Sequence, residues 1–255
     1  YLNMNKYNFA MDSFNKVILL DELYANAHYY LGLIFESILD YEKAIIHYKK
    51  AKRYGSAFKD LNIQYGGLLY NLNYFQDAIN PLKDYLLENG DQLDVLIMLG
   101  DIFYTEMRYQ EAISIYNKLT DDSPENIFYK NRLANSFYHL QSYEEAINIY
   151  KEILIDNSEN ISIMKKLGDI YYELENYEES INYYNDVIEC EGEDKDILYK
   201  IALSYIQVNK FLQSLITFKK ASIYDPNNQI IQYQIGVTYV ELELYKQALH
   251  YFINY

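Results

Sequence analysis

The feature that most constrains this chain is a repeat of 34 residues that runs from end to end without an insertion or a deletion. Three sets of positions, each advancing by 34, show it. The first holds alanine or serine: Ala10, Ala44, Ala78, Ala112, Ala146, Ser180, Ser214 and Ala248. The second holds glycine or alanine: Gly32, Gly66, Gly100, Ala134, Gly168, Ala202 and Gly236. The third is aromatic: Tyr7, Tyr41, Phe75, Tyr109, Tyr143, Tyr177, Phe211 and Tyr245. A fixed period in this range predicts one supersecondary unit stacked on copies of itself.

Each unit is predicted to be a pair of amphipathic helices. In residues 93–126 the first half carries apolar side chains at a spacing of three and four, which places them on one helical face: Val95, Leu96, Leu99, Ile102 and Phe103. The second half repeats this pattern, and Pro124 then ends the second helix. Gly100 and Ala112 mark the points where the paired helices are expected to approach closely.

These residues resemble the signature of the tetratricopeptide repeat. In residues 93–126 the matching positions are Leu96, Leu99, Gly100, Phe103, Ala112, Tyr116 and Pro124, although no copy has the signature tryptophan. The resemblance covers the whole chain as one array, with a partial repeat at 1–24, full repeats at 25–58, 59–92, 93–126, 127–160, 161–194 and 195–228, and a partial repeat at 229–255. It implies an all-α fold, a tetratricopeptide-type α-solenoid forming a right-handed superhelix of helix-turn-helix repeats. Because the chain starts and stops inside a repeat, we expect it to be a fragment of a longer array.

The charge and the cysteine content of the chain disfavour several classes of function and predict where the protein is located. The chain has 37 acidic and 22 basic residues, a formal net charge of −15, which disfavours a general nucleic-acid binder or a binder of anionic membranes. No apolar stretch approaches the roughly 20 residues that a membrane-spanning helix needs. A single cysteine, Cys190, cannot form an intramolecular disulfide, so an intracellular, cytoplasmic setting is predicted.

No chemistry-bearing motif is present in the sequence. The four histidines are scattered without metal-ligand spacing: His28, His47, His139 and His250. Pairs of carboxylates such as Glu144 and Glu145 recur where second helices begin, and there they complement the helix dipole. We therefore predict no catalytic residue, no metal site and no cofactor, and a protein that is not an enzyme.

The resemblance also implies a binding surface, because the first helices of tetratricopeptide arrays line a concave groove that holds peptides. By register, the lining positions are the second, fifth, sixth, ninth, twelfth and thirteenth of each repeat. The twelfth position supplies Tyr70, Tyr104, Tyr138 and Tyr172, and the sixth supplies Arg132, Lys166 and Lys200, with Asn131, Asn135 and Lys165 beside them. This set is similar to the carboxylate clamp of some family members, so a partner with an acidic or C-terminal carboxylate group is expected. For Lys165, an intrahelical pair with Asp169 is the favoured interpretation.

Three functions remain open at this point. The first is a non-enzymatic scaffold that binds a peptide or helix of a protein partner in the groove. The second is the recruiting arm of a larger enzyme, for example a glycosyltransferase or a signalling protein, whose catalytic domain lies outside this chain. The third is a purely structural part of a self-assembling complex. Self-association through uncapped ends is also expected, because Phe9, Phe14, Tyr239 and Phe252 would expose apolar faces there.

Overall fold

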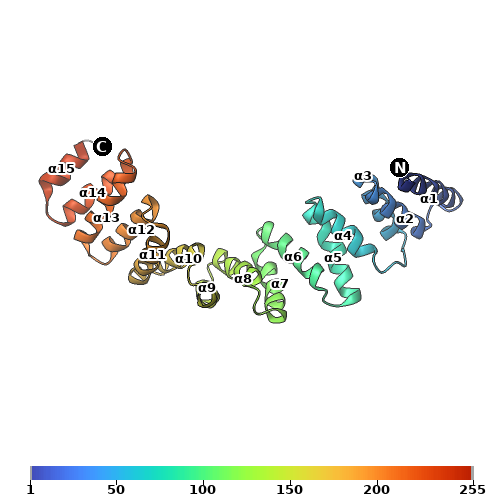
Figure 1. The fold of residues 1–255 in the computed structure, drawn as a ribbon, viewed down its shortest axis with the longest axis horizontal. Helices are drawn as coiled ribbons and strands as arrows, with labels where there is room; N and C mark the ends of the chain where they lie inside the picture. The colour runs from blue at the N-terminus through green and yellow to red at the C-terminus, as the bar shows by residue number, and fades with distance from the viewer. Residues whose placement is uncertain (1, 254–255) are drawn as a thin grey trace. The chain divides into compact units, whose positions relative to one another are not determined.

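The computed structural model describes residues 2–253, and for residues 2–5 it describes the backbone alone. It contains helices and turns, and no β-strand occurs within 2–253 (Figure 1). The helices are α1 (Leu2–Leu20), α2 (Ala25–Ser37), α3 (Tyr41–Arg53), α4 (Leu61–Asn71), α5 (Phe75–Asn89), α6 (Leu93–Thr105), α7 (Tyr109–Asp122), α8 (Ile127–His139), α9 (Tyr143–Asp156), α10 (Ile161–Glu173), α11 (Tyr177–Glu191), α12 (Lys195–Gln207), α13 (Phe211–Tyr224), α14 (Gln229–Glu241) and α15 (Tyr245–Ile253). The predicted all-α fold of helix-turn-helix repeats is confirmed.

The chain divides into two compact units, residues 1–136 and 137–255, with the boundary inside α8. In the first unit, each helix from α1 to α6 packs against the next one along the chain. In the second unit, the same holds for each helix from α9 to α14. The organisation of 1–255 as one continuous array stays a prediction, and its outermost residues, 1 and 254–255, lie outside the described part of the chain.

The small-residue positions lie where the two helices of a repeat touch. The side chain of Ala112 is fully buried, as are those of the other described alanines of this set that lie inside full repeats. Where serine replaces alanine, its hydroxyl bonds across the contact: Ser180 Oγ donates to the carbonyl oxygen of Gly168 at 2.9 Å, and Ser214 Oγ donates to that of Ala202 at 2.9 Å. A larger side chain at these positions would hold the helices apart.

The glycines of the second set lie against an aromatic ring of the paired helix. A Cβ atom placed on Gly168 would come within 2.6 Å of Cε1 of Tyr184, and one placed on Gly32 within 2.5 Å of Cδ1 of Tyr48. Both tyrosines are buried, so neither ring has space to withdraw. Glycine is therefore needed here for close approach, as the sequence pattern predicted.

The turn inside each repeat contains a feature that the sequence analysis missed. One residue of the turn adopts a left-handed backbone conformation, with φ between 58° and 64°, at positions that again advance by 34: Leu39, Asn73, Met107, Gln141, Glu175, Asn209 and Glu243. The next amide caps the first helix; for example, Arg108 N donates to the carbonyl oxygen of Phe103 at 2.8 Å. Glycine and asparagine favour this conformation, and only Asn73 and Asn209 provided that signal.

Candidate functional site

The four tyrosines at the twelfth position each pack against the aromatic residue that begins the second helix of the same repeat. The ring centroids are separated by 6.0 Å for Tyr70 and Phe75, 5.9 Å for Tyr104 and Tyr109, 6.1 Å for Tyr138 and Tyr143, and 5.3 Å for Tyr172 and Tyr177. All four tyrosines are half-buried near the C-terminal end of a first helix. Two of them belong to the first unit and two to the second.

Two of the three cations at the sixth position lie over tyrosines of the twelfth position, whereas Nζ of Lys200 lies 5.5 Å from the ring centroid of Tyr184. In the first unit, the guanidinium carbon of Arg132 lies 4.3 Å from the ring centroid of Tyr104. In the second unit, Nζ of Lys166 lies 4.8 Å from the ring centroid of Tyr138, and burial lowers the pKa of this lysine. A cation over a tyrosine face is a favourable contact. The sequence predicted both sets of positions, and the structure brings two members of each set into contact as the pairs Arg132–Tyr104 and Lys166–Tyr138.

Two aspartates that the sequence analysis did not single out organise the same helical face. Asp169 accepts a hydrogen bond from the Tyr184 hydroxyl at 2.5 Å and forms an ion pair with Lys200. In the first unit Asp101 likewise accepts from the Tyr116 hydroxyl at 2.9 Å. Burial is the main cause that raises the pKa of Tyr184 and of Tyr116, so both hydroxyls stay protonated and donate. The signal for these aspartates was present, since each directly follows a glycine of the small-residue set.

The remaining predicted site residues form contacts of their own. Lys165 pairs with Glu191 at 2.6 Å, so the predicted intrahelical pair of Lys165 with Asp169 is wrong. The physical reason is that Asp169 already has two partners, while Glu191 lies at the end of the neighbouring helix α11. Asn131 accepts a hydrogen bond from Asn135 one turn later, at 3.1 Å.

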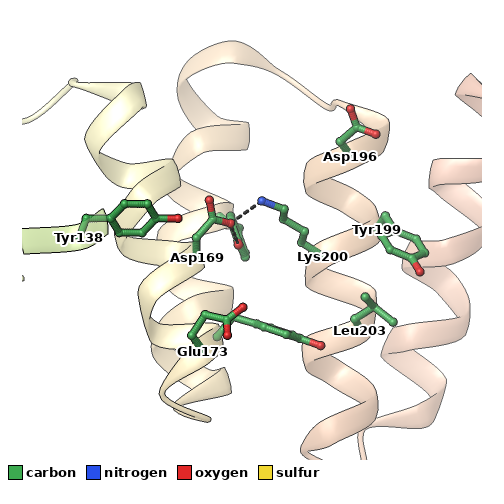
Figure 2. Close-up of a pocket in the computed structure, with 9 residues that line it drawn as sticks. Tyr138, Asp169, Glu173, Asp196, Tyr199, Lys200 and Leu203 are labelled. Carbon is green, nitrogen blue, oxygen red and sulfur yellow. Dashed lines mark hydrogen bonds and ion pairs between the residues drawn. The ribbon is translucent and has the colours of Figure 1, made fainter. Parts of the chain in front are cut away.

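A cleft of about 640 Å³ lies on the first helices of the second unit. It is lined by Tyr138 of α8, Asp169, Tyr172 and Glu173 of α10, Tyr184 of α11, and Asp196, Tyr199, Lys200 and Leu203 of α12. Figure 2 shows the ammonium group of Lys200 directed at Asp169, with Tyr138 and Tyr199 on either side of this pair. Eight of the nine lining residues occupy the register positions that the family resemblance assigns to the groove, and only Tyr184 comes from a second helix. Three predicted residues meet here: Tyr138, Tyr172 and Lys200.

The histidines His28 and His47 form a pair in the first unit. Their Nδ1 atoms lie 3.0 Å apart, and His28 Nε2 lies 3.2 Å from the carbonyl oxygen of Glu22. Burial lowers the pKa of both rings, that of His47 to about 4. Across the described residues, no group of three or more His, Cys, Asp or Glu side chains is placed to hold a metal ion. Nor does any helix found there combine the length and apolar character needed to cross a membrane.

Comparison with known proteins agrees with this architecture. A family model described as "Anaphase-promoting complex, cyclosome, subunit 3" matches residues 105–187, about a third of the chain. Among solved structures, one of MamA has a TM-score of 0.57 at 19% identity and covers 66% of this chain and 92% of its own. The structure of Naa15/Naa10 bound to HypK-THB has a TM-score of 0.72 at 13% identity, covering 93% of this chain and 37% of that chain. A sequence search of curated proteins found no match.

The helix pairs, the 34-residue signature and these likenesses show that the chain has the all-α fold of tetratricopeptide-type helix-turn-helix repeats. The segment 105–187, from the end of α6 into α11, is the part that is similar to the anaphase-promoting complex subunit. Repeats of this type are generally modules of protein–protein interaction. At sequence identities of 13–19%, the similarity to these solved structures supports the fold and no particular function.

Proposed function

We propose that this protein is a non-enzymatic scaffold that binds an extended peptide or a helix of a partner protein on the first helices of its repeats. The observation that carries the proposal is the cleft of about 640 Å³, lined almost entirely from the groove positions of three successive repeats. Tyrosines supply large, rigid and amphipathic contact area, which is enriched at interfaces. Tyr138 and Tyr172 are already held in place by their neighbours, so binding costs little side-chain entropy.

The first unit offers a related surface in this proposal. Tyr70 and Tyr104 occupy the twelfth position there, Arg132 lies on the Tyr104 ring, and Asn131 and Asn135 follow along α8. Tyr70 also donates to Asp101 at 3.2 Å, so its ring is positioned from both ends. These residues extend the proposed contact beyond the single cleft.

The contacts of the lysines make an acidic partner, which the sequence predicted, less favourable. A carboxylate clamp requires cations that are available to the ligand. Lys200 is paired with Asp169 and Lys165 with Glu191, so an acidic or C-terminal carboxylate group would have to displace an internal ion pair to reach either lysine. Arg132 and Lys166 lie instead over the rings of Tyr104 and Tyr138. We keep the acidic partner as the less favoured variant of the proposal.

Two further parts of the proposal concern context. A cytoplasmic setting suits Cys190, a free and exposed thiol, because reducing compartments preserve thiols.

A role as the recruiting arm of a larger assembly or enzyme is the second candidate function. It is favoured by the similarity of residues 105–187 to a subunit of a complex, and by the similarity of the fold to Naa15, whose structure was solved as a complex.

The third part of the proposal is self-association, for which the structure exposes fewer apolar residues than the sequence predicted. Phe9 is exposed, and Phe252 and Ile253 leave an apolar edge on α15. Tyr239, in contrast, is buried in the core of the second unit, and Phe14 stacks on Tyr30 at 5.0 Å. The expectation of uncapped faces at Tyr239 and Phe14 is therefore wrong, because helices α15 and α2 provide their cover. Sedimentation over a range of concentrations tests whether the remaining residues associate.

Selection of binding peptides from a displayed random library tests the main proposal. Peptides enriched on the parent protein should bind Tyr172→Ala at least about tenfold more weakly, because this ring is a central wall of the cleft. Tyr245→Ala is the matched control, since Tyr245 is exposed on α15 and does not line the cleft. Equal loss in both variants, or in neither, would refute the assignment of the binding face.

A further inference from the structure

The cleft of the second unit contains carboxylates that no internal cation neutralises. Asp169 and Lys200 satisfy each other, and Asp169 also accepts from Tyr184. Glu173 and Asp196 line the same cleft, are exposed, and form no ion pair with any residue that the structure describes. After the internal pair is discounted, two negative charges therefore face the opening from α10 and α12.

The walls between these carboxylates are aromatic. Tyr172 of α10 and Tyr199 of α12 line the cleft together with Tyr138. Lys166 already lies over the ring of Tyr138, which shows that a tyrosine at this register position accepts a cation on its face. Over the rings of Tyr172 and Tyr199 there is no lysine or arginine from the described residues. Both rings also pack against an aromatic neighbour, Tyr172 on Tyr177 and Tyr199 on Phe218, so a ligand cation would contact only the part of each ring that lines the cleft.

We propose that this cleft receives the side chain of a basic residue, arginine or lysine, carried by the bound partner segment. The proposal deepens the peptide-binding function above and rests on it. Glu173 and Asp196 would pair with the cationic group, while Tyr172 and Tyr199 would contact its flat face or its aliphatic stem. Arginine fits better than lysine, because a planar guanidinium both stacks on aromatic rings and donates to carboxylates in pairs. The net charge of −15 favours the approach of a basic segment over that of an acidic one.

The other occupants fit the cleft less well. An acidic side chain would lie beside Glu173 and Asp196, with Lys200 already engaged by Asp169. An apolar side chain would contact Leu203 and the rings, but it would remove water from two carboxylates without replacing their hydrogen bonds. Both alternatives are separate outcomes of the test.

The test uses the intact chain with ring-¹³C-labelled tyrosine and an NMR titration at constant ionic strength. The probes are N-acetyl-arginine methylamide, the neutral isostere N-acetyl-citrulline methylamide, and N-acetyl-glutamate methylamide. We expect the arginine probe to shift the resonances of Tyr172 and Tyr199, with an affinity at least about fivefold above that of the citrulline probe. The variant Glu173→Gln/Asp196→Asn should lose this preference. The variant Glu159→Gln/Glu189→Gln makes the same change of charge at exposed positions outside the cleft and should keep it.

Three results would overturn the inference. Equal binding of citrulline and arginine would show an uncharged aromatic pocket. Tighter binding of the glutamate probe would restore the acidic ligand. Absence of any shift at Tyr172 and Tyr199 with the arginine probe would remove the site. In each case, continued dependence of library peptides on Tyr172 would leave the proposed peptide-binding function intact, so the two failures are distinguishable.

Discussion

The ammonium group of Lys200 forms an ion pair with the carboxylate of Asp169, across neighbouring first helices of the second unit. Asp169 is also the acceptor for the hydroxyl of Tyr184, which is buried between the helices of its repeat. One carboxylate thus links α10, α11 and α12. A cation that the sequence pattern offers to a ligand is used inside the protein instead.

Removing Asp169 and removing Lys200 should lower the free energy of unfolding by different amounts. Asp169→Ala should lower the free energy of unfolding by about 1–3 kcal/mol, because the buried Tyr184 hydroxyl loses its carboxylate acceptor. Lys200→Ala should cost less than about 1 kcal/mol, because the lysine side chain is 41% exposed and water screens the pair. Urea unfolding followed by circular dichroism measures both. A larger loss for Lys200→Ala than for Asp169→Ala would contradict this ranking.

The glycine positions allow a matched pair of substitutions. Gly168→Ala should destabilise the protein by roughly 1–3 kcal/mol, because the new methyl group would meet the buried Tyr184 ring. Gly67→Ala should be neutral or stabilising by up to about 1 kcal/mol, because a Cβ there meets nothing within 4 Å and alanine favours the helix. Thermal melts of the two variants give the comparison. If both variants melted with the parent, the close-packing argument would fail.

The left-handed turn residue predicts a stabilising change. Met107 is exposed and has φ of 58°, so its side chain contributes strain and little burial. Met107→Gly should raise the free energy of unfolding by about 0.5–1 kcal/mol. The control Ser114→Gly places glycine at an exposed position inside α7 and should lower stability by about 0.5 kcal/mol. A loss of stability in Met107→Gly would show that the turn tolerates methionine without strain.

The histidine pair predicts a dependence of stability on pH. Burial, then His28 and Lys50, lower the pKa of His47 to about 4, whereas the unfolded chain takes up a proton near its ordinary value of 6.5. Between these values the unfolded state binds more protons, so stability is fully present above about pH 6.5 and is lost as the pH falls toward about 4. Because the ring is only about half-buried, solvent screening reduces the expected loss to on the order of 2 kcal/mol.

The measurement is the urea midpoint of the parent and of His47→Gln between pH 4 and pH 8. The variant should show a shallower decline below pH 6.5, and both proteins should follow parallel curves above pH 7. Identical slopes at low pH would mean that the pair carries no such linkage.

The sequence allowed the fold to be predicted because periodicity reports local structure. Apolar spacing placed the helices, and the small residues at positions such as Gly168 and Ser180 marked the contact between them. The left-handed turn conformation could not be predicted, because most residues at this position, such as Met107, do not favour it. Here the capping hydrogen bond of the next residue holds the backbone regardless of the side chain.

The candidate site could be predicted only to the level of register. Position along the repeat identified Tyr138, Tyr172 and Lys200 as neighbours, since groove positions follow from the helix pair. The partners of long side chains could not be read in this way. Lys165 reaches Glu191 of the next helix, and Lys200 reaches Asp169 of the preceding repeat, because the stacking of neighbouring helices decides which carboxylate lies nearest.

Site-specific photocrosslinking in the native cell shows whether a partner protein binds on the first helices. A photoreactive p-benzoyl-phenylalanine replaces Tyr172 in the cleft, or Ile223 on α13 as an exposed control outside it. We expect a discrete protein adduct at position 172 that disappears when a library-selected peptide is added as competitor, and none at position 223. An adduct at position 223 with none at 172 would refute binding on the first helices and place the binding surface on the second helices.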